Sequence, residues 1–158
     1  MSEPFTHFDE QGASRMVDVG QKRVSQRMAR ASGLVHMQPE TLRKIQAGEH
    51  AKGNVLEVAR LAGIMAAKRT AELIPLCHSL PLESVQIQFC YPNAETLSIS
   101  ATVTTTAKTG VEMEAFTAVS IAALTVYDMC KSVDRAMQIE RIQLEEKSGG
   151  NSGHFMRT

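Results

Sequence analysis

The sequence lacks tryptophan, and aromatic residues make up only 4% of its 158 positions. Base-stacking platforms for single-stranded nucleic acid need aromatic side chains, so this composition argues against that class of protein. The 17 basic and 17 acidic residues cancel, so no net charge attracts nucleic acid or an anionic membrane surface. Any site for an anion must therefore be local.

Cysteine is also scarce. Cys77, Cys90 and Cys130 are odd in number, widely spaced and in no CxxC motif, which predicts neither a disulfide framework nor a zinc site. We find no apolar run of membrane-spanning length, and the first 12 residues have neither the basic nor the apolar region of a signal peptide. We therefore expect a cytoplasmic protein. Its length fits one domain over residues 1–158, with flexible segments at 1–13 and 148–158.

A long helix is predicted after residue 108. Thr109 and Glu112 have the spacing of a capping box, in which each side chain satisfies a free backbone donor of the first turn. From there to Asp134 the chain has no proline or glycine, and apolar residues cover nearly the whole helical circumference. A helix that is apolar all round is buried, so we expect this one to be the centre of the core.

Charged residues lie at both ends of this helix. Asp128 and Lys131 are spaced i, i+3 and share a face. They form either a structural ion pair at the helix C-terminus or an acid/base pair in a pocket, where a desolvated lysine shifts its pKa readily. Glu112 and Glu114 lie at the other end, and Glu114 is roughly 21 Å from Asp128 along a helix. If both ends function, either two sites exist or a second, antiparallel copy completes one site in a homo-oligomer.

The rest of the chain predicts a split β-α-β-β-α-β order. Alternating or turn-bounded apolar residues predict strands at 15–19, 29–37, 85–91 and 97–105. Helices are predicted from Pro39 to Gly48 and after Asn54, an N-cap with Glu57 at the reciprocal position. A last strand is predicted at 139–144, with a bulge at 140–141. Around residues 27–30 the strand competes with a helix. From residue 29 onward the order is that of ferredoxin-like α+β folds, with an antiparallel sheet and helices packed on one face.

Three segments without regular periodicity carry reactive groups. Residues 74–82 contain two prolines yet are largely apolar, so they form either a loop lining a cavity or a core connector whose His78 bonds backbone. Lys52 precedes a helix start, where free N–H groups favour an anion. The glycine-rich tail at 147–153 is either disordered or a loop that closes over phosphates. With Arg27 as a further candidate phosphate contact, these residues suit acid/base chemistry on an anionic small molecule.

Six segments also occur in order in a known family. They are MVDV (16–19), AGIMAAKRT (62–70), LIPLCH (73–78), KTGVEMEA (108–115), YDMCK (127–131) and KSGG (147–150). Over about residues 5 to 155 the sequence resembles the molybdenum cofactor biosynthesis protein C family, the cyclic pyranopterin monophosphate synthases. The resemblance implies a ferredoxin-like enzyme that converts a cyclised dihydro-GTP to cyclic pyranopterin monophosphate and releases pyrophosphate. It implies a hexamer, a trimer of dimers with sites at the dimer interface, and no cofactor; whether Mg²⁺ accompanies the triphosphate stays open.

The resemblance also assigns roles. Asp128 is the expected acid/base, with Lys52 and Lys131 as essential lysines. The expected substrate-binding positions are Leu76, Cys77, His78, Met113 and Glu114, together with Arg27, Glu112 and Lys147. The sequence departs from the family pattern at Ala51, Asn54, Ser79 and Asn151. Two other classes of protein fit the residues, a nucleotide-binding module without catalysis and a structural subunit of a larger assembly.

Overall fold

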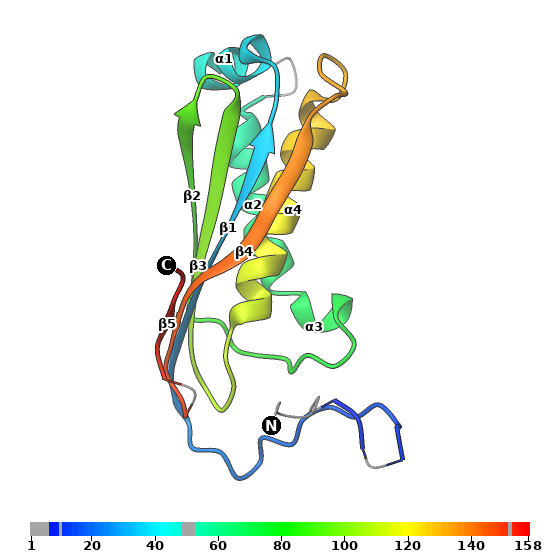
Figure 1. The fold of residues 1–158 in the computed structure, drawn as a ribbon, viewed down its shortest axis with the longest axis vertical. Helices are drawn as coiled ribbons and strands as arrows, with labels where there is room; N and C mark the ends of the chain where they lie inside the picture. Colours follow the sequence, from blue (N-terminus) through cyan, green and yellow to red (C-terminus); the bar gives the residue numbers. More distant parts are fainter. Residues whose placement is uncertain (1–6, 10, 49–52, 152) are drawn as a thin grey trace.

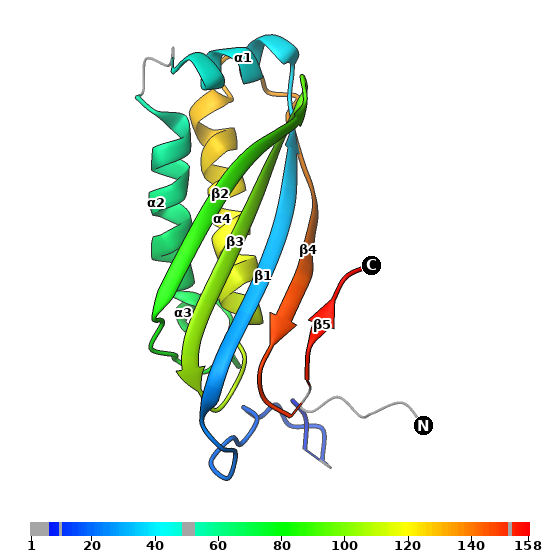
Figure 2. The ribbon, with the colours of Figure 1, turned by 90° about the vertical axis from the view of Figure 1, so that its left-hand side faces the viewer.

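The computed structural model describes residues 7–9, 11–48, 53–151 and 153–158. Its elements in chain order are β1 (Ser25–His36), α1 (Pro39–Ala47), α2 (Val55–Ala67), α3 (Thr70–Leu73), β2 (Ser84–Asn93), β3 (Thr96–Ala107), α4 (Glu112–Cys130), β4 (Gln138–Ser148) and β5 (Phe155–Met156). The five strands form one sheet in the order β2-β3-β1-β4-β5, and every neighbouring pair is antiparallel. Figures 1 and 2 show α2 and α4 side by side on one face of this sheet. The predicted α+β class and its split β-α-β-β-α-β order are confirmed.

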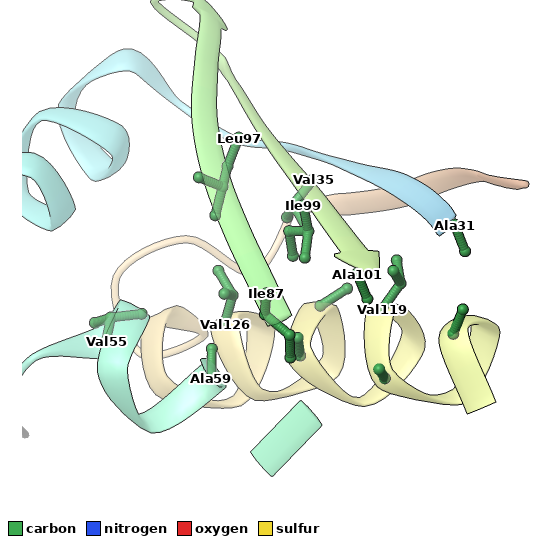
Figure 3. Close-up of a cluster of buried hydrophobic side chains, with 14 of the residues drawn as sticks. Ala31, Val35, Val55, Ala59, Ile87, Leu97, Ile99, Ala101, Val119 and Val126 are labelled. Atoms are coloured by element: carbon green, nitrogen blue, oxygen red, sulfur yellow. The ribbon is translucent and has the colours of Figure 1, made fainter. Parts of the chain in front are cut away.

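The core lies between the sheet and these two helices. Inward-facing residues of the central strand β1, among them Ala29, Ala31 and Val35, are fully buried, as expected for a strand with one covered face. Figure 3 shows Val119 and Val126 of α4 among the buried side chains of the sheet. The helices α2 and α4 approach closely because their facing residues are small. A Cβ on Gly63 would lie 2.8 Å from the carbonyl oxygen of Ala118.

Several local predictions are confirmed. Gly48 ends α1 in the left-handed conformation, with φ of 69°. Asn54 caps α2 by accepting hydrogen bonds from the amides of Leu56 and Glu57, although the Glu57 carboxylate accepts from Arg60 Nε instead of reciprocating. The hairpin of β2 and β3 forms as expected. The predicted bulge in β4 is present: Arg141 has φ of 54°, and the register with β1 shifts between Ser32 and Leu34.

The predicted start and end of the long helix are wrong. Helix α4 begins at Glu112 and ends at Cys130, and its N-cap, Val111, makes no side-chain capping hydrogen bond. Glu112 is therefore the first residue of the helix and not the third, so the capping box with Thr109 does not form. The physical reason is a distant partner: the Glu112 carboxylate pairs with Lys147 Nζ at 3.1 Å.

Burial of α4 on all sides is also wrong for part of its circumference. One side packs on the sheet and a flank packs on α2, but Met113 and Leu124 are 39% and 53% exposed. No element of the described chain covers that outer face. Contrary to the sequence expectation, α4 is long and apolar enough to cross a membrane, but more than half of it is buried as the core helix of the fold.

The chain before β1 differs from expectation as well. Residues 15–19 form no strand, and the bridge in this region joins Phe8 to Ser14. The segment is instead tied to the rest of the protein by a hydrogen bond from Lys108 Nζ to the carbonyl oxygen of Gly20, at 2.7 Å. At the other end of the chain, β5 pairs with β4 through Glu146 and Lys147.

Candidate functional site

A cavity of about 840 Å³ lies at the end of the molecule where α4 begins. Its walls come from three segments that are far apart in sequence: 22–28 before and within β1, 108–112 leading into α4, and 147–151 after β4. Five cations line it, Lys22, Arg23, Arg27, Lys108 and Lys147, against the single carboxylate of Glu112. A chain without net charge thus gathers positive charge locally, which suits an anion.

A second cavity of about 330 Å³ adjoins the first. Lys22, Thr109, Gly110 and Glu112 line both cavities. The other walls of the second cavity are His7, Val17, Val19, Leu76, Cys77, His78, Leu80, Met113 and Glu114. The interpretation of the loop at 74–82 as a cavity wall is confirmed. The fold therefore brings the expected substrate-binding residues of the LIPLCH and KTGVEMEA motifs to one place: Leu76, Cys77, His78, Glu112, Met113 and Glu114.

Glu114, in the first turn of α4, is the more deeply buried of the two carboxylates that line this second cavity. It is only 4% exposed. Its pKa is raised to about 6, chiefly by burial; a hydrogen bond from its own backbone opposes this rise, and the negative charge of Glu112 adds to it. Burial, and then the charge of Glu114, also raise the pKa of the Cys77 thiol. Cys77 is therefore a neutral thiol at pH 7 and not an activated nucleophile.

Arg27 and Lys147 both line the larger cavity, but their bonds differ. Arg27 is buried, and its guanidinium donates to the carbonyl oxygens of Ala107, Lys108 and Gly149. Lys147 lies on β4 and pairs with Glu112 on α4, each side chain being roughly a quarter exposed. Lys147 is thus close enough to the cavity to meet a bound anion.

Sequence reasoning missed Lys22 and Lys108 as residues of this site. The only signal for Lys22 was a basic stretch after Gly20, which resembles an ordinary solvated surface. Lys108 is the first residue of the KTGVEMEA motif but carried no signal of its own as a ligand. The contact of Lys108 with Gly20 is what brings the segment of Lys22 to the cavity wall.

Asp128 and Lys131 lie at the opposite end of α4, beside α1 (Figure 1). Lys131 Nζ is 2.6 Å from Asp128 Oδ1, and the side chains are 53% and 66% exposed. Their hydrogen bond raises the pKa of Lys131. Within one chain, Asp128 and Lys131 therefore form an exposed ion pair that lies far from Glu112 and Glu114. Lys52 lies outside the described residues.

Comparisons with known proteins identify the family of the chain. The profile of the MoaC family matches residues 16–150. Cyclic pyranopterin monophosphate synthase 3 of Mycobacterium tuberculosis H37Rv is 64% identical over 152 residues, covering 96% of this chain and 86% of the relative. Synthase 1 of the same strain is 60% identical, covering 97% and 90% of the two chains. The synthase of Brevibacillus brevis is 55% identical over 157 residues, covering 99% and 98%.

Proposed function

The chain belongs to the MoaC family, and we propose on this basis that it is a cyclic pyranopterin monophosphate synthase of molybdenum cofactor biosynthesis. In this proposal it converts a cyclised dihydro-GTP to cyclic pyranopterin monophosphate and releases pyrophosphate. The proposal places this reaction in the cytoplasm.

The observation that carries the proposal is the pair of adjoining cavities. A cationic cavity of about 840 Å³ shares a wall with a smaller cavity that contains apolar side chains, a buried carboxylate and a neutral thiol. Such a pair fits a ligand with a triphosphate at one end and a heterocycle at the other. A site for phosphate alone would need only the first cavity.

In the larger cavity, cations stabilise charge on the triphosphate. Intramolecular attack of a substrate hydroxyl on the α-phosphorus forms the P–O bond of the cyclic phosphate and breaks the bond to pyrophosphate, so negative charge develops on the leaving group and on the non-bridging oxygens. Lys22, Lys108 and Lys147 line the cavity at which this charge develops, and the family resemblance adds Lys52. An arriving phosphate competes with the Glu112 carboxylate for Lys147, since both are anions.

In the smaller cavity, the heterocycle meets Leu76, Cys77, His78, Met113 and Glu114. A ring derived from guanine presents several N–H donors, for which a carboxylate is a strong acceptor. Glu114 has a pKa of about 6, so at pH 7 it is mostly ionised and able to accept. Because Glu114 itself is buried, little water competes for these bonds, which strengthens them.

The proposed acid/base pair comes from a second copy of the chain. Asp128 and Lys131 cannot reach the cavities of their own chain, because α4 separates them from Glu114. An antiparallel α4 of a partner would bring Asp128 of the partner subunit to the site. The outer faces of both helices are apolar enough to associate: Val58, Leu61 and Met65 on α2 and Leu124 on α4 are all more than 40% exposed. We extend the proposal to a hexamer built as a trimer of such dimers.

In this composite site Asp128 moves protons during ring opening and reclosure, and Lys131 holds it in place. Lys131→Ala should therefore lower turnover far more than substrate affinity. Equal losses through affinity alone would reassign Lys131 to binding.

The experiment is pyrophosphate release from cyclised dihydro-GTP by wild type and Asp128→Ala, with substrate binding measured in parallel. We expect release to fall by 10²-fold or more, on the order found for a lost acid/base group, while binding is kept. Glu40→Ala is the matched control, because it removes another exposed helical ion pair, with Lys44. Release by Asp128→Ala equal to the control would contradict the assignment. Binding without release by wild type would favour a nucleotide-binding module, and neither binding nor release would favour a structural subunit.

A further inference from the structure

Arg27 has a bonding pattern that a phosphate ligand would not need. It lies on β1 beneath the larger cavity and is 9% exposed. Its Nε donates to the carbonyl oxygen of Ala107 at 3.4 Å, Nη2 to that of Lys108 at 3.2 Å and Nη1 to that of Gly149 at 3.2 Å. Three of its five N–H donors are thus directed at backbone. The acceptors belong to two segments that are more than 40 residues apart in sequence.

These two segments are walls of the cavity. Lys108 begins the turn between β3 and α4, directly before Thr109 and Gly110. Gly149 follows β4, directly after Lys147 and Ser148. The guanidinium therefore links the two backbone segments that carry the cavity lysines Lys108 and Lys147.

The glycines of KSGG complete the same arrangement. Gly149 and Gly150 have φ of 97° and 74°, a region that side chains disfavour. A Cβ on Gly150 would also collide with Arg27 Nη1, and a Cβ on Gly149 would collide with the carbonyl oxygen of Gln26. The backbone must come this close for Arg27 to donate to it. Arg27 and the glycine pair therefore form one structural unit.

We propose that Arg27 is a positioning residue that sets the distance between the Lys108 turn and the Gly149–Gly150 turn, and that it is not itself a phosphate ligand. The inference rests on the proposed function only in taking the cavity as a phosphate site. Arg27 acts through Lys108 and Lys147, whose ammonium groups must converge on one anion. Misplacing such groups by about 1 Å is sufficient to cost 10²-fold in rate.

The two roles respond differently to lysine. A direct phosphate ligand acts mainly through its charge, so Arg27→Lys should keep most of the binding. A positioning residue acts through a rigid fork that reaches three carbonyls in two segments, which a single ammonium group cannot do. The proposal therefore expects Arg27→Lys to be as impaired as Arg27→Ala. Gly150→Ala should give the same defect, and adding it to Arg27→Lys should cost little more, since both changes break one contact.

Hydrogen–deuterium exchange of the ligand-free protein tests directly whether Arg27 holds the Lys108 turn and the Gly149–Gly150 turn together. Arg27→Lys and Gly150→Ala should speed exchange in both residues 108–111 and residues 149–151 and leave α2 and β3 protected. Arg30→Lys is the matched control, because Arg30 lies three residues away on the same strand and pairs with Glu146 instead. Unchanged exchange in either segment would overturn the proposal. Faster exchange throughout the fold would also overturn it, because Arg27 would then serve global stability alone.

Binding of tripolyphosphate and the KM of pyrophosphate release test the consequence for the site. Both Arg27→Lys and Arg27→Ala should weaken binding about tenfold or more, and to within about threefold of each other, with Arg30→Lys unchanged. Binding kept by Arg27→Lys and lost by Arg27→Ala would show that charge matters and would overturn the proposal. If wild type binds no tripolyphosphate and releases no pyrophosphate, the proposed function fails instead. The exchange measurement still decides whether Arg27 holds the two turns together.

Discussion

Replacing Glu114 by glutamine should make the stability of the protein less dependent on pH. The carboxyl is buried in the first turn of α4, and its pKa is raised from 4.5 to about 6. The folded protein therefore holds this proton more tightly than the unfolded chain does. The contribution of this carboxyl to the free energy of unfolding is greatest below pH 4.5. It is lost as pH rises through about 6, because the folded protein must then keep a charged group buried.

The expected size follows from the shift. About 1.5 pH units correspond to about 2 kcal/mol of free energy of unfolding, at about 1.4 kcal/mol per unit. Glutamine has nearly the shape of the protonated acid and no charge to bury. Glu114→Gln should therefore match wild type near pH 4 and exceed its free energy of unfolding by up to about 2 kcal/mol near pH 8.

Urea unfolding at a series of pH values from 4 to 8 is the assay. The chain has no tryptophan, so far-ultraviolet circular dichroism is the suitable signal. Protein concentration must be held constant, because association contributes to apparent stability. Glu83→Gln, at an exposed position, controls for the loss of a carboxylate as such. A constant difference between Glu114→Gln and wild type over the whole range would refute the reasoning.

Three further predictions concern the assembly and the packing. Mixing inactive Asp128→Ala and Lys147→Ala chains should restore up to about a quarter of wild-type activity if sites are shared across a two-fold interface, and none if each chain carries a whole site. Asp134→Ala should lower the free energy of unfolding by roughly 1–3 kcal/mol in urea titrations, because the buried carboxylate accepts bonds from Gln38 N and Ala136 N; an unchanged midpoint would contradict this. Gly63→Ala should cost about 1–3 kcal/mol by forcing α2 from α4, and a fully stable variant would show that the helices can separate without loss.

Local patterns predicted most of the secondary structure. Alternating apolar residues in β1 and in the hairpin of β2 and β3 predict strands because strand periodicity depends on neighbouring positions alone. The turn chemistry of Gly48 and the cap at Asn54 likewise need only a few adjacent residues. Even the bulge near Arg141 was visible as a slip in the alternation of β4.

The predictions failed where a partner lies far along the chain. Thr109 and Glu112 have the capping-box spacing, yet Glu112 pairs with Lys147, which no local pattern announces. Residues 15–19 alternate like a strand, but they pair with no strand of the sheet in the described chain. Lys22 became a cavity residue only because Lys108 holds the preceding turn.

The sequence by itself determined the α+β class, the order of the elements and the family, since these depend on periodicity and on motifs in a fixed order. The tertiary structure decided which charges meet. The packing of α4 on the sheet sets Lys147 against Glu112, and the register of β4 with β1 sets Gly149 against Arg27. The length of α4 keeps Asp128 away from Glu114. Side-chain pairing of this kind depends on where separate strands and helices pack, which no stretch of a few residues contains.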